Sequence, residues 1–109
     1  MATGRLGVAD ITTTANTSVY TVPVGTFAVV SVSVCNRSPS SSAAIRISVS
    51  SSATPAASEY LEYDASLVAS GVLERTGIVM DAGKILVVST STGSSSLSVV
   101  VMGIETTTA

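Results

Sequence analysis

The chain has 109 residues, a formal net charge of −2 and no histidine, and its length matches one small domain. Only 11% of its residues are charged, and the basic ones are scattered along the chain: Arg5, Arg37, Arg46, Arg75 and Lys84. This composition excludes sequence-independent binding to nucleic acid, which needs clustered positive charge.

Residues 1–16 contain two glycines and a threonine run but no sustained hydrophobic period. We predict an extended N-terminal arm over 1–16 and a β-sandwich domain over 17–109. Because the arm lacks an apolar face for its own domain, we expect it to dock on a neighbouring subunit. Arg5 would pair there with a carboxylate or a carbonyl, and Leu6 and Val8 would fill shallow apolar pockets.

Three strands are predicted in the first half of the domain, at residues 18–22, 26–35 and 45–50. A Pro-Val-Gly turn ends the first. Valine and serine alternate from Val30 to Val34, which is typical of a strand with one apolar face and one hydroxyl face. Because Phe27 and Val29 fall in the other phase, we expect the start of this strand to be buried on both faces. The third strand places Ile45 and Val49 inward.

Five further strands are predicted at residues 59–64, 71–75, 77–80, 85–88 and 97–105, separated by turn residues. Residues 65–70 fit either a helical turn or a loop. In the strand at 59–64, Leu61 and Tyr63 should share one face and Tyr60 the other. The expected fold is an all-β antiparallel sandwich, jelly-roll-like, with about eight strands; strand spacing does not distinguish a jelly roll from an immunoglobulin-like order.

Catalytic chemistry is not expected. Serine nucleophiles need a positioned base, commonly histidine, and the Gly-x-Ser-x-Gly elbow is missing. Cys35 is the single cysteine, so no disulfide or Cys/His zinc site can form within one chain, and no Gly-rich phosphate loop is present. We predict no enzyme, no catalytic or metal-binding residue, and no cofactor.

The one concentrated polar group in the sequence consists of Glu59, Glu62 and Asp64. On a regular strand Glu62 and Asp64 would share one face and Glu59 the other. A solvated or inter-subunit face is the first interpretation, with a cation site or a glycosidase pair as alternatives. Tyr60 and Tyr63 similarly fit packing positions, or alternatively a sugar-stacking platform.

No apolar run approaches the roughly 20 residues of a membrane helix, and the first residues lack the apolar core of a signal peptide. We therefore expect a soluble protein used without secretion, with no membrane partner. With so few charged side chains, little on the surface opposes association with other molecules. This favours a domain that is packed against neighbours.

Residues 4–7, 26–37, 58–64 and 71–78 resemble small virion structural proteins of tailed bacteriophages, of the kind that infect marine cyanobacteria. The resemblance implies a capsid decoration or cement protein, located in the virion and assembled in the host cytoplasm. Contact with the major capsid protein or other virion subunits is implied as well. The low charge and the exposed strand edges predict a homo-oligomer, expected as a trimer that buries those edges. The alternatives are a tail, neck, baseplate or fibre protein and, in another class, a carbohydrate-binding module.

Overall fold

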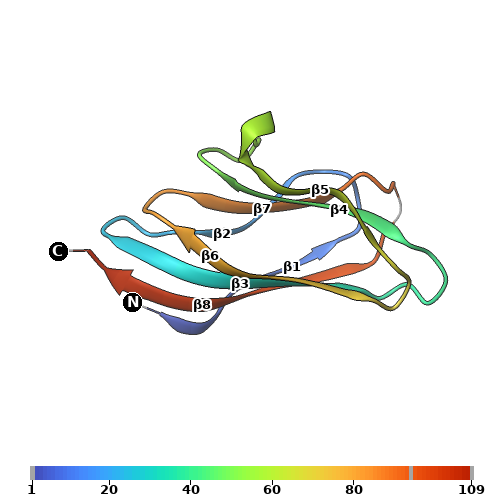
Figure 1. The fold of residues 1–109 in the computed structure, drawn as a ribbon, viewed down its shortest axis with the longest axis horizontal. Coiled ribbons are helices and arrows are strands. Elements are labelled where there is room, and N and C mark those ends of the chain that lie inside the picture. The colour runs from blue at the N-terminus through green and yellow to red at the C-terminus, as the bar shows by residue number, and fades with distance from the viewer. Residues whose placement is uncertain (1, 94, 109) are drawn as a thin grey trace.

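The computed structural model describes residues 2–93 and 95–108 and folds them into two four-stranded antiparallel sheets packed face to face (Figure 1). Sheet A has the order β1-β8-β3-β6 and sheet B the order β2-β7-β4-β5. The strands are β1 (Thr3–Ile11), β2 (Thr17–Thr21), β3 (Thr26–Asn36), β4 (Ala43–Ser50), β5 (Tyr60–Leu67), β6 (Val72–Met80), β7 (Ile85–Thr90) and β8 (Leu97–Thr107), with a 3-10 turn, η1 (Ala57–Glu59), before β5. The predicted all-β sandwich of about eight strands is confirmed.

The strand pairing is that of a ribbon folded on itself. β1 pairs with β8, β2 with β7, β3 with β6 and β4 with β5, all antiparallel. The pairs β3·β8 and β4·β7 then join these ribbon segments into the two sheets. Eight strands connected in this way form the double Greek key of a jelly roll. The structure thus decides the order that strand spacing left open.

The core between the sheets is almost entirely aliphatic. From β3, Val30, Val32 and Val34 point inward and are at most 1% exposed. Ile45 and Ile47 of β4 meet them from sheet B and are fully buried. Each such side chain contributes about 1.5–3 kcal/mol when fully buried, so many small aliphatic residues build a core in a sequence with only 4% aromatic residues.

Most of the expected N-terminal arm is instead an edge strand of sheet A. β1 pairs with β8 from Thr3 opposite Ile104 to Ile11 opposite Leu97. Ile11 is 2% exposed and Leu6 packs against the core, so this segment does contribute apolar side chains to its own domain. An extra residue between Arg5 and Gly7 shifts the register, which is why the segment shows no period of two.

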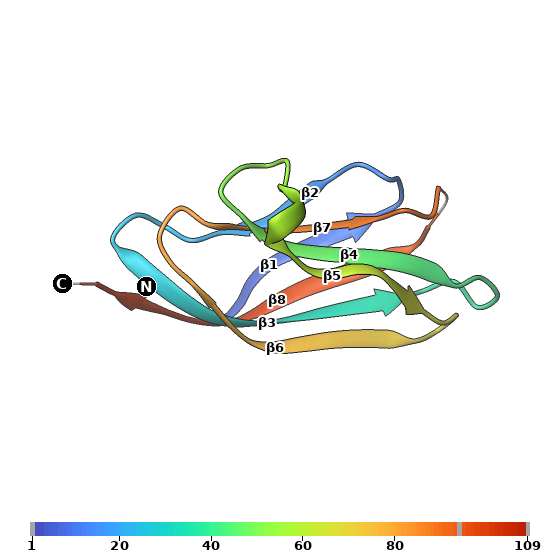
Figure 2. The ribbon, with the colours of Figure 1, turned by 45° about the horizontal axis from the view of Figure 1, so that its top comes forward.

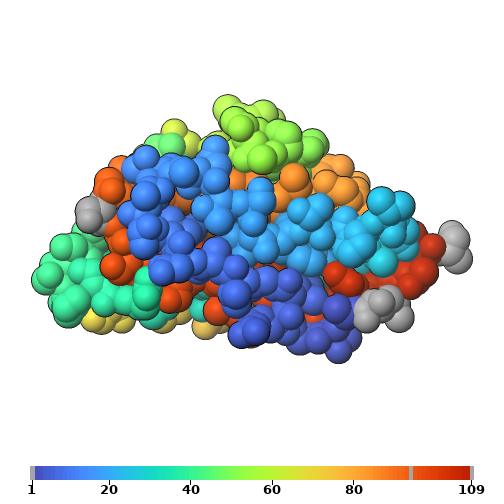
Figure 3. All heavy atoms as spheres, turned by 180° about the vertical axis from the view of Figure 1, so that it is seen from behind, coloured from blue at the N-terminus to red at the C-terminus, as the bar shows by residue number. Residues whose placement is uncertain are grey.

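Glycine at position 7 allows β1 to lie directly against β2, as seen from behind in Figure 3. A Cβ atom added there would lie 2.3 Å from the carbonyl oxygen of Val19. The close approach of these two edge strands closes one side of the sandwich.

The strands predicted at 71–75 and 77–80 form one strand, β6. Gly77 has φ of +70° and lies in a bulge of β6, so the strand bends there without ending. Within residues 65–70, β5 continues to Leu67 and a turn follows.

All register shifts between paired strands lie in the four edge strands. β1, β2, β5 and β6 each carry at least one extra residue relative to the neighbouring strand, whereas the central pairs β3·β8 and β4·β7 are unbroken. Bulges twist an edge and interrupt its row of free N–H and C=O groups, which hinders pairing with another strand. The expectation that strand edges are buried in a trimer therefore conflicts with this geometry.

A buried carboxylate fastens the two ends of the chain together. Glu105 of β8 is 9% exposed and accepts hydrogen bonds from the Tyr20 hydroxyl, at 2.6 Å, and from the Ala2 amide, at 3.0 Å. The backbone amide of Glu105 donates in turn to the Ala2 carbonyl. Figure 1 accordingly shows both chain ends at the same end of the sandwich.

The inward direction of Val32 can be tested with a matched pair of substitutions. Val32→Asp forces a carboxylate into a fully buried apolar position, so we expect the free energy of unfolding to fall by about 3 kcal/mol or more, or folding to fail. Ser31→Asp adds the same group on the outward side and should change it by less than about 1 kcal/mol. Urea unfolding measures both, and equal stability of the two variants would show that the assigned facing is wrong.

Tyr20 should make the protein sensitive to alkali. Burial, and then the Glu105 carboxylate, raise the pKa of Tyr20 above its ordinary value of 10.0, so the folded state holds this proton more tightly than the unfolded chain. Unfolding therefore releases a proton above about pH 10, and the free energy of unfolding falls as the pH rises further. Tyr20→Phe should lose less stability between about pH 9.5 and 11.5 by urea unfolding; parallel pH profiles would contradict this account.

Candidate functional site

The acidic triplet does not form one site. Glu62 pairs with Arg75 of β6, and Asp64 pairs with Arg46 of β4 at 2.7 Å. Glu62 and Asp64 therefore do not share a side of β5 as predicted, because register shifts and the positive φ of Asp64 (55°) break the alternation. Among residues 2–93 and 95–108, no group of His, Cys, Asp or Glu is arranged to hold a metal ion.

Glu59 organises the loop that covers sheet B. Its carboxylate accepts hydrogen bonds from the Ala56 amide (2.8 Å), the Ser51 amide (3.1 Å) and the Ser50 hydroxyl (3.0 Å). The amide hydrogen bonds, that of Ala56 first, hold the pKa of Glu59 below its usual value. Figures 1 and 2 place η1 on the outer side of sheet B, where Ser48 and Ser50 are fully buried.

Tyr60 and Tyr63 lie together, contrary to the predicted opposite faces. Their rings meet edge to face with centroids 5.0 Å apart, and with Pro55 and Ala57 they line a shallow hollow. The Arg46 guanidinium lies 4.2 Å from the centre of the Tyr63 ring. Because the rings are perpendicular and one face is already used, these tyrosines do not form a flat platform for a sugar.

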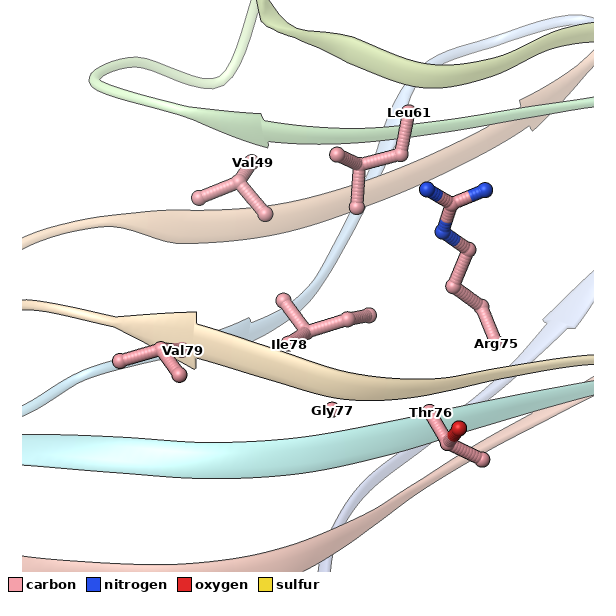
Figure 4. A pocket seen from close by; sticks show the side chains of 7 residues that line it. All are labelled: Val49, Leu61, Arg75, Thr76, Gly77, Ile78 and Val79. Atoms are coloured by element: carbon pink, nitrogen blue, oxygen red, sulfur yellow. The ribbon is translucent and has the colours of Figure 1, made fainter.

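A second hollow opens between the sheets on the side formed by β5 and β6. Val49 and Leu61 reach from sheet B toward Ile78 of β6, with Arg75 beside them (Figure 4). Val49, Leu61 and Ile78 all belong to or pack against the core, and the Arg75–Glu62 ion pair links the two sheets beside the hollow. These contacts tie the two sheets together on this side of the sandwich.

The outward side of sheet A carries most of the exposed apolar surface. Nine large hydrophobic residues are exposed among the described residues, and six of them point outward from sheet A. We call these six the sheet A face: Val8, Val29, Val72, Val79, Met102 and Ile104. Exposed apolar surface collected on one face marks an interaction site more often than scattered residues do.

The register explains how the sheet A face is assembled. Ile104, Val29 and Val79 lie directly opposite one another on β8, β3 and β6, and they are 56%, 42% and 69% exposed. Met102, 41% exposed, is the next outward residue of β8. The prediction that the start of β3 is buried on both faces is therefore wrong at Val29. Its outward phase was visible in the sequence, but the missing cover over sheet A was not.

A family model for the fourth Ig-like domain of Trs120/TRAPPC9 matches residues 6–92. The match covers most of the chain, from within β1 to beyond β7, and ends before β8. The chain belongs to this Ig-like domain family. Neither the curated proteins nor the solved structures contain a match to the chain. Ig-like sandwiches share a two-layer architecture without always sharing one strand order, so the jelly-roll order is compatible with membership.

The family match overturns the resemblance to bacteriophage virion proteins. It names a domain of Trs120/TRAPPC9, so the decoration or cement role, the tail, neck, baseplate or fibre alternative and the virion location are all corrected. The expected homotrimer and major capsid protein partner are corrected with them, and the match gives no support to a carbohydrate-binding module. The segments that carried the resemblance are mainly β-strands with alternating apolar residues, a pattern that unrelated sandwiches also need.

The secondary structure of the described residues contains no helix with the length and apolar character of a membrane span.

The loop over sheet B should respond to acid through Glu59. Since the pKa of Glu59 is lowered in the folded state, its contacts with the amides persist below the usual value of 4.5 and are lost as the pH falls through the lowered pKa. Amide chemical shifts of Ser51 and Ala56, followed by NMR, should show a midpoint below 4.5. In Glu59→Gln this transition should vanish, whereas an unchanged transition would mean that another group controls the loop.

Proposed function

We propose that this chain is a non-catalytic Ig-like domain that joins protein parts within a larger assembly, as a domain of the Trs120/TRAPPC9 kind. The family match carries the proposal, since it covers residues 6–92. Trs120/TRAPPC9 is a subunit of a trafficking complex, so the partner is another protein segment of such a complex. A structural or binding role depends on an exposed surface and not on reactive side chains. The described residues provide such a surface on the outward side of sheet A.

The sheet A face is the surface proposed for this contact. Its central row, Ile104, Val29 and Val79, is exposed and lies in register across β8, β3 and β6. Sheet B offers no equivalent, because the loop before β5 covers Ser48 and Ser50 on its outer side. Each apolar side chain buried in a contact contributes about 25 cal/mol per Å² of surface removed from water.

An exchange experiment tests the proposal. Residues 2–108 replace the fourth Ig-like domain of a Trs120/TRAPPC9 protein, and copurification of the other subunits is measured. We expect assembly with the unchanged face, and at least a fivefold loss of copurified subunits when Met102→Asp and Ile104→Asp are combined, because two exposed anchors become charged. Val24→Asp is the control, since Val24 is 95% exposed and lies outside sheet A.

Circular dichroism and thermal unfolding establish that the exchanged domain and its variants are folded. A folded domain that does not support assembly would overturn the proposed role. Normal assembly with both aspartates present would overturn the assignment of the contact to the sheet A face.

A further inference from the structure

The shape of the exposed apolar surface limits what can cover it. Along β8, Val100, Met102 and Ile104 point outward in succession and form a narrow stripe. On the β3 side the stripe is bordered by Ser31 and Ser33, which lie opposite Met102 and Val100. The apolar surface is one strand wide at Met102, gains Val8 of β1 beside Val100, and widens across β3 and β6 at the Ile104 row.

An apolar stripe that follows a single strand, with Arg5, Ser31 and Ser33 beside it, matches a helix better than a second sheet. Sheets pack through several strands at once, over a broad apolar surface, whereas an amphipathic helix presents one stripe of residues spaced three and four apart. Val100 to Ile104 spans about 14 Å at roughly 3.4 Å per residue. A helix covers that length with about nine residues, or two and a half turns.

Addition of a strand at an edge is disfavoured by the same structure. Bulges in β1 and β6, the edges of sheet A, interrupt the regular rows of N–H and C=O groups that a new strand would pair with. A partner must then approach the face of the sheet and not its edge.

Two charged residues flank the stripe on opposite sides. Arg5 of β1 lies opposite Met102, and Glu74 of β6 lies opposite Ser33, so both are on the outward side of sheet A. Both are exposed, and neither is ion-paired with another residue in the described ranges. A partner that carries an anion beside Arg5 and a cation beside Glu74 would complement this pattern, and opposite charges on the two sides would fix its direction.

We propose that an amphipathic α-helix of the partner protein binds along β8 on the sheet A face, with acidic residues toward Arg5 and basic residues toward Glu74. The inference rests on the proposed function, because it names the partner of the same surface. Helix direction follows from the charges: turning the helix end for end exchanges its two flanks and places like charges together.

The probe is a synthetic 16-residue helix with leucines at three- and four-residue spacing, glutamates on one flank and lysines on the other. Binding to the full chain is followed by NMR of the methyl groups. We expect shifts at Val100, Met102 and Ile104. Arg5→Glu should weaken this peptide about three- to tenfold and strengthen a peptide with lysines on both flanks, while Val24→Asp should leave both affinities unchanged.

A spin label at the peptide N-terminus reports direction. It should broaden methyl signals at one end of the stripe, either Ile104 or Val100, and at the other end when the two flanks of the peptide are exchanged. Equal broadening at both ends, shifts confined to the Tyr63 side, or no effect of Arg5→Glu would overturn the helix proposal. If the peptides fail while the aspartate variants still break assembly in the exchange experiment, the docking role stands and only the helical partner is wrong.

Discussion

The pairing of β3 with β8 is the constraint on which the rest of the structure depends. These two strands are in register without interruption from Thr26 opposite Thr107 to Asn36 opposite Leu97. A slip of one residue would turn Val30, Val32 and Val34 outward and their serine neighbours into the core. The valine and serine alternation therefore fixes the register, and with it the inner and outer side of every neighbouring strand. Because the centre is fixed in this way, the edge strands can carry bulges without loss of the core.

The elements that could be predicted are those whose alternation survives in the fold. β3, β4, β7 and β8 follow the predicted ranges closely, and their inward residues form the core. β1 was missed because a bulge removes its period of two, and β6 was split because Gly77 looks like a turn. One strand is absent from the prediction and another is divided in two, so the predicted and observed numbers of strands agree. Bulges also explain the separation of Glu62 and Asp64, since a single extra residue exchanges the faces of all that follow.

The surface assigned to function could be predicted only in part. The outward phase of Val29, Val79 and Ile104 can be read from alternation, but their exposure depends on whether another segment covers sheet A, which is a tertiary property. The virion resemblance failed for a related reason. Its residues describe apolar strands that many sandwiches share, and no side chain in them performs a chemistry specific to one family.

The two outer faces differ because of one loop. Val87 of β7 points outward from sheet B, opposite Ser48, yet it is 2% exposed, whereas Val29 in the matching central position of sheet A is 42% exposed. Glu59 holds the loop over sheet B through hydrogen bonds with Ser50, Ser51 and Ala56. Sheet A has no intramolecular counterpart among the described residues. An outward valine is thus covered within the domain on one sheet and exposed to solvent on the other, which makes the sheet A face the side available for the proposed contact.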